Sequence, residues 1–268
     1  MENRRGISYR GFIPVRREPS DSSEMVSQVL FGETFRILEE EEQWTLISLD
    51  FDLYEGWVGK GSINVLKSNN GPEMETDAPL YETGSIVKVP FTTVMDLNLS
   101  SQLILPAGSV CPEASGSIAS IGGRRFEILN EDAWIKPHKD SDPEEIGNGL
   151  ISISYLWGGR SGFGFDCSGL VQTLCRMMGI HIPRDSKQQA GLGSIINFIH
   201  EIRKGDLAFF ENASGEIAHV GMVLDQGRIL HSHNQVRIDK LDQQGIYNTE
   251  CEDYTHKLRI IKRIVSTT

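Results

Sequence analysis

The sequence predicts an α+β protein in which small β-rich regions precede one region that combines a helix with strands. Short apolar runs, broken by acidic or Gly-containing turns, fill residues 10–139 as they do in small β-domains. Residues 166–179 instead space their apolar side chains as a helix does, and strand-like runs follow them. A helix followed by an antiparallel meander is an α+β arrangement.

The first region, residues 1–68, is expected to form a small β-domain. Turns separate its strand-like runs, and the acidic residues 39–42 fit a solvated hairpin turn. The strand-like runs are Ser27–Phe31, Thr34–Leu38, Trp44–Leu49 and Tyr54–Val58.

The second region, residues 69–139, is expected to form another, divergent β-domain. The turn at Gly122-Gly123 lies among its short strand-like runs, and Asp140–Pro143 marks a linker or a helix start. The expected strands are Ser85–Val89, Gln102–Leu105, Ser117–Ile121, Arg125–Leu129 and Ala133–Ile135.

The third region, residues 140–268, is expected to hold the helix and the meander. Gly179 stands where helices commonly end. The expected strands are Leu207–Phe210, His219–Leu224, Arg228–Ser232 and Arg259–Val265.

Composition excludes several classes of function. The 268 residues are 39% hydrophobic with a net charge of −11, which argues against nucleic acid or an anionic membrane as a partner. No apolar run is long enough to span a membrane, and no signal peptide is evident as written. We therefore expect a cytoplasmic monomer, although a trimmed leader would leave the same sequence.

The four cysteines have no CxxC pair and no regular spacing, so no disulfide framework is expected. Zinc sites use clustered Cys or His ligands, and only His231-Ser232-His233 comes close. We expect no metal and no cofactor.

Cys167 is a candidate nucleophile because it lies in the first turn of the expected helix, after a Gly-rich stretch. Unpaired backbone N–H groups at that position lower a thiol pKa and are able to bind an oxyanion. Asp166 would stand at or near the N-cap. Taken alone, Cys167 could equally be a small core residue like Cys175.

His219 is the candidate base. A hairpin turn at residues 225–227 brings it opposite some residue between 231 and 234. A catalytic imidazole needs a polar partner on its other ring nitrogen. His231 and His233 share one face of their strand, so the register leaves both open.

Two segments together resemble the signature of the NlpC/P60 peptidases, which are papain-like cysteine enzymes of bacterial cell-wall metabolism. They are Tyr155-Leu156-Trp157-Gly158-Gly159-Arg160 and Phe165-Asp166-Cys167-Ser168-Gly169-Leu170-Val171. Lys204–Phe210 and Ala218–Val223 are similar to later blocks of that family, in the same order. The likeness covers about residues 150–235.

This resemblance implies a papain-like catalytic domain with Cys167 as nucleophile and His219 as base. It also implies His231 as the third polar residue, rather than His233, and Tyr155 as a tyrosine whose hydroxyl helps the oxyanion. No metal takes part.

About 55 residues of the first region resemble a bacterial SH3 domain. The residues that carry this likeness are Gly32-Glu33-x-Phe35, Trp44 and Tyr54-Glu55-Gly56-Trp57-Val58. The full chain therefore resembles the γ-D-glutamyl-L-diamino acid endopeptidases of dipeptidyl-peptidase VI type, with one or two SH3-like barrels before the catalytic domain.

That subset implies a small muropeptide substrate, L-Ala-γ-D-Glu-diamino acid, whose free amine binds Glu24 and Tyr54. The substrate contacts it implies are Asp166, Ser168, Arg184, Asp185 and Ser186. The expected role is release of L-Ala-γ-D-Glu in peptidoglycan recycling. The alternatives are a secreted hydrolase of intact wall, an amidase or acyltransferase of the same fold, and an inert protein that binds wall fragments.

Overall fold

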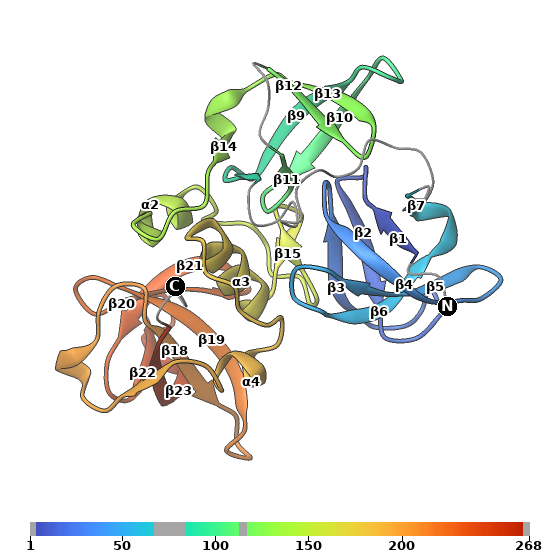
Figure 1. The fold of residues 1–268 in the computed structure, drawn as a ribbon. Coiled ribbons are helices and arrows are strands. Elements are labelled where there is room, and N and C mark those ends of the chain that lie inside the picture. Colours follow the sequence, from blue (N-terminus) through green and yellow to red (C-terminus); the bar gives the residue numbers. More distant parts are fainter. Residues whose placement is uncertain (1–3, 67–83, 113–116, 265–268) are drawn as a thin grey trace. The chain divides into compact units, whose positions relative to one another are not determined.

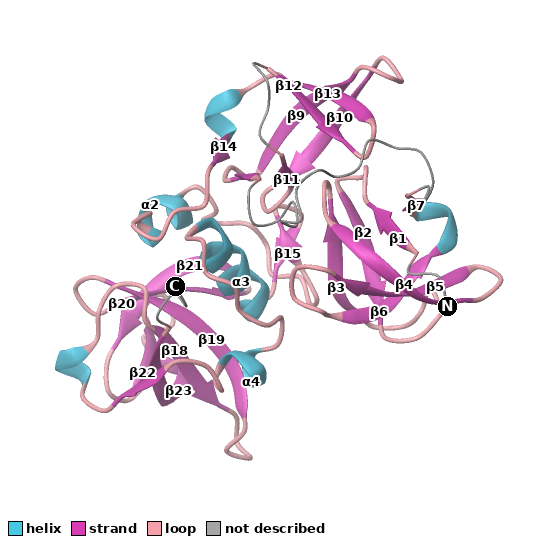
Figure 2. Cartoon of the chain, in the orientation of Figure 1, coloured by secondary structure: helices cyan, strands magenta, loops and turns pink. Residues whose placement is uncertain are grey.

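The computed structural model describes residues 4–66, 84–112 and 117–264, so the predicted domain boundary at 68/69 lies outside the described residues. The chain is α+β and consists mainly of strands, as predicted (Figure 1, Figure 2). Among the described residues, no helix is both long and apolar enough to cross a membrane.

The elements follow one another in this order. Among the described residues, the strands before residue 143 are β1 (Arg5–Ile7), β2 (Phe12–Arg16), β3 (Met25–Leu30), β4 (Thr34–Glu40), β5 (Trp44–Leu49), β6 (Glu55–Gly59), β7 (Asn64–Val65), β8 (Ser85–Val87), β9 (Phe91–Asp96), β10 (Ser101–Pro106), β11 (Val110–Cys111), β12 (Ile118–Ile121), β13 (Arg124–Ile128) and β14 (Trp134–Ile135). The later elements are α2 (Pro143–Asn148), β15 (Arg160–Ser161), β16 (Gly164–Phe165), α3 (Cys167–Met177), α4 (Ser186–Gln189), β17 (Ser194–Ile196), β18 (Leu207–Glu211), β19 (Ile217–Leu224), β20 (Arg228–His233), β21 (Gln235–Leu241), β22 (Gly245–Asn248) and β23 (Asp253–Arg263). Three 3₁₀ turns are η1 (Lys60–Ser62), η2 (Glu131–Ala133) and η3 (Ile199–Glu201).

The described residues form two compact units. The first takes the chain up to Pro137 together with Trp157–Phe163, and the second takes His138–Leu156 and the chain from Gly164 onward. Each unit is described by itself below.

In the first unit, the N-terminal strands form one antiparallel sheet in the order β3-β2-β6-β5-β4-β1-β7. Its strands alternate buried and exposed residues, as in β2, where Ile13 and Val15 point into the core. This sheet is the predicted SH3-like domain, and its core is closed by Phe35, Ile47 and Val58.

The second β-rich region contributes two smaller sheets, β10-β9-β13-β12 and β11-β8-β14. Its core is shared with the first domain, because Ile7, Tyr9 and Phe31 pack in one cluster with Phe126 and Leu105. The backbones also meet closely, since the Val110 N–H donates to the Phe31 carbonyl at 2.9 Å. The two β-rich regions are therefore one packed body.

Within the first unit, the segment Trp157–Phe163 packs on the other residues of that unit through a buried arginine. Arg160 donates from both terminal nitrogens to the Glu33 carboxylate at 2.8 Å, and its guanidinium lies 4.6 Å from the centre of the Phe51 ring. A bidentate arginine–carboxylate pair fixes both partners in one geometry. Gly158, with φ +75°, lies so close to Met25 that a Cβ there would stand 2.3 Å from the Met25 carbonyl oxygen.

The second unit is built on a sheet in the order β17-β23-β18-β19-β20-β21-β22, in which β22 also pairs with β23. That extra pairing closes the strands from β18 to β23 into a six-stranded barrel, with β17 added at the β23 edge. Phe210, Val223, Ile229, Ile246 and Ile261 belong to its core. The predicted meander is confirmed, and β21, β22 and β17 are strands that the sequence analysis did not identify.

The predicted helix in residues 166–179 is confirmed as α3. Asp166 is its N-cap and accepts from the Gly169 N–H at 2.7 Å, and Gly179 follows the helix with φ +70°. The segment at Asp140–Pro143 is a helix start, because Asp142 caps α2 by accepting from the Glu144 N–H.

Candidate active site

Cys167 is the first residue of α3, and its side chain is 8% exposed. Helix α3 packs on β19 and β20, the strands that carry His219 and His231. The backbone N–H of Val220, the residue after His219, hydrogen-bonds the Cys167 sulfur, as does that of Ser168. The thiol therefore lies at the helix N-terminus and against the start of the His219 strand.

Asp166, Ser168 and Arg184 form one buried polar cluster beside the thiol. Arg184 donates to the two Asp166 carboxylate oxygens at 3.0 and 2.5 Å and to the Ser168 hydroxyl at 2.8 Å. Arg184 is 2% exposed. The cluster ties the helix cap to the segment before α4, so three of the predicted substrate contacts hold one another in place.

The thiol is uncharged in the resting protein. Burial, reinforced by the negative charge of Asp166, raises the pKa of Cys167 to about 12, while the Val220 and Ser168 N–H groups and Arg184 oppose that rise. The Ser168 N–H at the helix N-terminus lowers this pKa, as the sequence indicated, but removing the sulfur from water outweighs that effect. The thiolate must therefore form with the help of a base.

His219 and His231 meet through their ring nitrogens. His219 Nε2 lies 2.9 Å from His231 Nδ1, and both side chains are buried. The β19–β20 ladder ends at the Gly221–His231 pair, so His219 lies just beyond it, within the register range that the sequence predicted. Between the two alternatives left open by the sequence, His231 makes this hydrogen bond; His233 lies with its ring centre 6.5 Å from that of His219.

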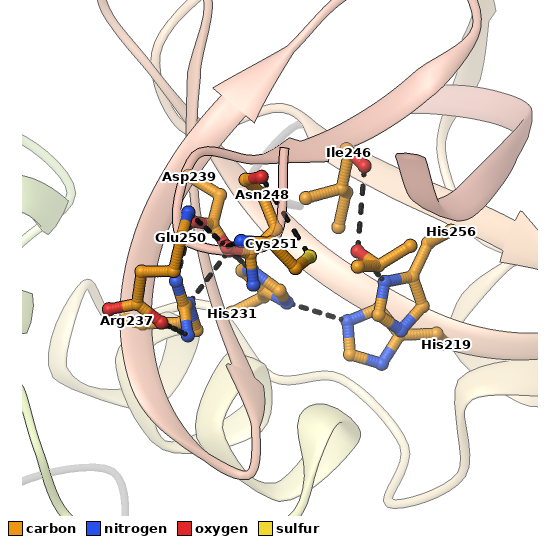
Figure 3. A network of polar contacts seen from close by, with 10 residues as sticks. His219, His231, Arg237, Asp239, Ile246, Asn248, Glu250, Cys251 and His256 are labelled. Atoms are coloured by element: carbon orange, nitrogen blue, oxygen red, sulfur yellow. Dashed lines mark hydrogen bonds and ion pairs between the residues drawn. The ribbon is translucent and has the colours of Figure 1, made fainter. Parts of the chain in front are cut away.

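Asp239 fixes the tautomers of this pair (Figure 3). Its Oδ2 lies 3.0 Å from His231 Nε2, and Arg237 donates to both of its oxygens at 2.8 and 3.0 Å. Burial opposes ionisation, but the hydrogen bonds from His231 and Arg237 hold the pKa of Asp239 below its usual value. An ionised carboxylate only accepts, so His231 Nε2 carries a hydrogen and His231 Nδ1 accepts from His219 Nε2–H. The basic nitrogen of His219 is then Nδ1.

The neutral form of His219 is favoured by its surroundings. Burial, followed by the nearby imidazoles of His256, His231 and His233, holds the pKa of His219 well below 6.5. The His256 ring is stacked on the His219 ring, with centres 4.0 Å apart and planes at 27°. A buried neutral imidazole, on a strand that packs on the helix of Cys167, has the chemistry of a general base.

The remaining predicted site residues of this unit differ in their exposure to solvent. Tyr155 is half-buried, and burial, with the nearby Cys167 and Asp166, raises the pKa of its hydroxyl. A tyrosine that keeps its proton is a hydrogen-bond donor. Asp185 is exposed just before α4, and Ser186 begins that helix, partly exposed.

Glu24 and Tyr54 belong to the first unit. Glu24 is exposed, and its two carboxylate oxygens accept from Trp157 Nε1 at 2.6 Å and Arg17 Nε at 2.7 Å. The hydrogen bond from Trp157, followed by that from Arg17, lowers the pKa of Glu24, so it is ionised. Tyr54 packs against the core of the first barrel.

The sequence analysis did not identify Asp239, Arg237 or His256. Alternation in Val236-Arg237-Ile238-Asp239 is a strand signal that could have placed both β21 residues beside β20. Nothing local marks His256, which lies near His219 because β23 pairs with β18, the strand beside β19.

Two family models match the chain. The model described as "NlpC/P60 family" matches residues 152–254, and the "Bacterial dipeptidyl-peptidase Sh3 domain" model matches residues 15–63. The first overlaps the predicted likeness at residues 150–235, and the second includes the residues from Gly32 to Val58 that carry the SH3 likeness.

Similar proteins extend across both regions. The γ-D-glutamyl-L-lysine dipeptidyl-peptidase of Bacillus subtilis is 29% identical over 223 residues, which cover 77% of this chain and 71% of that protein. Dipeptidyl-peptidase 6 of Lysinibacillus sphaericus is 24% identical over 85% of this chain and 88% of its own. In fold, an NlpC/P60 family protein from Bacillus cereus has a TM-score of 0.80 at 19% identity and covers 97% of this chain and 99% of its own.

Proposed function

Given that this chain belongs to the NlpC/P60 cysteine peptidases and carries a bacterial SH3 domain, we propose that it cuts the γ-D-glutamyl–diamino acid bond of muropeptides with a free N-terminal L-Ala, releasing L-Ala-γ-D-Glu. The observation that carries this proposal is the buried pair of His219 and His231 beside the helix that begins at Cys167. Similarity to γ-D-glutamyl-L-lysine dipeptidyl-peptidases over both regions supports the substrate class.

The proposed reaction is acyl transfer. His219 Nδ1 takes the Cys167 proton as the sulfur attacks the γ-D-glutamyl carbonyl, and the same proton then passes to the departing amine as the C–N bond breaks. Water hydrolyses the thioester, with His219 again accepting a proton. In this proposal His231 orients the base, and the Tyr155 hydroxyl with the N–H groups at the start of α3 stabilises the oxyanion.

The substrate contacts are proposed on the same basis. Asp185 and Ser186 are accessible to a ligand, whereas Asp166, Ser168 and Arg184 are buried together. We propose that Asp185 and Ser186 touch the substrate and that the buried cluster shapes the pocket for L-Ala and D-Glu. No part of this reaction needs a metal or cofactor.

For the free amine, we propose that Glu24 and Tyr54 provide the partners. An ammonium needs a nearby charge when it is removed from water. Glu24 is exposed and ionised, and its bond to Trp157 holds it to a residue only two positions after Tyr155 in the chain.

The decisive experiment compares L-Ala-γ-D-Glu-L-Lys with its N-acetyl form, and repeats the pair with meso-diaminopimelate in place of lysine. Acetylation removes the charge, so kcat/KM should fall at least about a hundredfold, or roughly 2.7 kcal/mol. The variant Glu24→Gln should lose most of that discrimination, whereas Glu18→Gln, an exposed acid of the same region, should keep it.

Equal rates on the free and acetylated peptides would instead favour the secreted hydrolase of intact wall. With the predicted discrimination, intact wall resists because its alanine is amide-linked. That restriction suits a cytoplasmic monomer that recycles fragments, which we propose as the setting. Mass spectrometry of the products identifies the bond that is cut.

A further inference from the structure

His256 has no part in the proposed reaction, yet it completes a cluster of three imidazoles. One ring nitrogen from each of His219, His231 and His256 lies within 4.8 Å of the others. His256 is carried by β23, stacks on His219 and has its ring centre 5.7 Å from that of His231. Its side chain is partly buried.

The outer nitrogens of two of these rings already have oxygen partners. His231 Nε2 lies 3.0 Å from Asp239 Oδ2, and His256 Nδ1 lies 2.9 Å from Thr255 Oγ1. Metal-binding histidines have this arrangement, in which an oxygen on the far nitrogen fixes the ring and makes the near nitrogen more basic. His231 Nδ1 and His256 Nε2 are therefore the nitrogens left for an ion.

We propose that His219, His231 and His256 form an inhibitory site for a borderline divalent ion, Zn²⁺ being the best match. Three imidazoles and one open position are the ligand set of many zinc sites. Zn–N bonds of about 2.0–2.1 Å at tetrahedral angles place the nitrogens about 3.3 Å apart. To bind the ion, His219 Nε2 and His231 Nδ1 move slightly further apart than their present 2.9 Å. A rotation of the partly buried His256 ring brings its nitrogen, which now lies within 4.8 Å of the other two, to the same spacing.

Binding at this site excludes turnover. The ion takes His219 Nε2, so the hydrogen of that nitrogen moves to Nδ1 and no proton is released. His219 Nδ1 then carries a hydrogen and no longer accepts the Cys167 proton. The site goes beyond the proposed function, because it regulates the histidine pair whatever substrate is cut.

Zinc binding is measured by calorimetry on full-length Cys167→Ala, which removes the thiol as a ligand and needs no substrate. We expect one Zn²⁺ per chain with a Kd of about 10 μM or tighter, and a rise in Tm on adding zinc. In the double variant Cys167→Ala/His256→Gln, zinc binding should be at least about tenfold weaker, and the rise in Tm should be absent. The matched control is His200→Gln, an exposed histidine of η3, which should change neither.

Absence of saturable binding to Cys167→Ala would overturn the proposal, as would equal binding with and without His256. Each variant is first compared without zinc by circular dichroism and Tm, so that loss of binding is separated from loss of fold. In turnover assays, zinc should inhibit the wild type reversibly, EDTA should restore the rate, and EDTA alone should do nothing. The binding assay uses no peptide, so its result stands even if the enzyme does not cut the proposed substrate.

Discussion

Helix α3 carries a buried cysteine near each end, and the two thiols have different neighbours. Burial raises the pKa of Cys175 to about 12, with no other group contributing. Burial also raises that of Cys167 to about 12, but two backbone N–H groups and Arg184 favour its charged form. The two thiols therefore differ in their partners: groups that favour a thiolate contribute at Cys167, and burial alone acts on Cys175.

The largest expected effect comes from removing each thiol in turn. Cys167→Ala should abolish turnover, a loss on the order of 10⁶-fold, as for other enzyme nucleophiles. Cys175→Ala is the matched control on the same helix and should leave the chemistry intact at a cost of about 1 kcal/mol in stability. Turnover on the tripeptide and iodoacetamide inactivation measure both. Retained activity in Cys167→Ala would end the cysteine-peptidase assignment.

The next effect tests the proposed base, His219, through its partner His231. His231→Ala should lower kcat about 10²- to 10³-fold with little change in KM, because an orienting partner acts mainly in the transition state. His233→Ala, two residues along the same strand, should change kcat by less than about threefold. The reverse result would mean that His233, and not His231, orients the base.

A smaller effect is expected from Asp239→Asn, which keeps the shape of the side chain. The amide cannot accept from both Arg237 and His231 in the same geometry, so part of the population reverses the histidine tautomers. We expect kcat to fall about tenfold to a hundredfold, a fraction of what a general base supplies. Glu250→Gln, whose side chain accepts from Arg237, is the control and should stay near wild type. Nitrogen chemical shifts of the His219 ring in Cys167→Ala report the tautomer without turnover.

The smallest effect is the pH dependence near neutrality. His219 has a pKa well below 6.5, so its neutral, basic form is fully present at pH 7 and is lost only as the pH falls through that lowered pKa. The Cys167 thiol keeps its proton at these pH values. We therefore expect kcat/KM to be flat between about pH 6.5 and 7.5 and to fall about tenfold per unit only in more acid solution. An acid limb centred near pH 6.5 would contradict the buried neutral pair.

Much of the site could be predicted because its signals are local. The helix of Cys167 follows from apolar spacing and an Asp cap, and the hairpin follows from the turn at residues 225–227. The choice of His231 over His233 came from family resemblance and agrees with the observed hydrogen bond. The catalytic roles themselves remain predictions.

What could not be predicted depends on contacts between distant parts of the chain. Glu24 and Trp157 are 133 positions apart, and His256 lies near His219 because β23 pairs with β18, the strand beside β19. The net shift of the thiol pKa could not be predicted, because a sequence shows the helix N-terminus but not how completely the sulfur is removed from water.

The core shared by the two N-terminal β-regions has a consequence for how such proteins are recombined. Ile7, Tyr9 and Phe31 of the first barrel are at most 8% exposed in a cluster that includes Phe126 and Leu105. Moved alone into another protein, the first barrel would expose these side chains, at about 1.5–3 kcal/mol for each large apolar one. Gene fusions and chimeras should therefore transfer both β-regions together, as one folding unit.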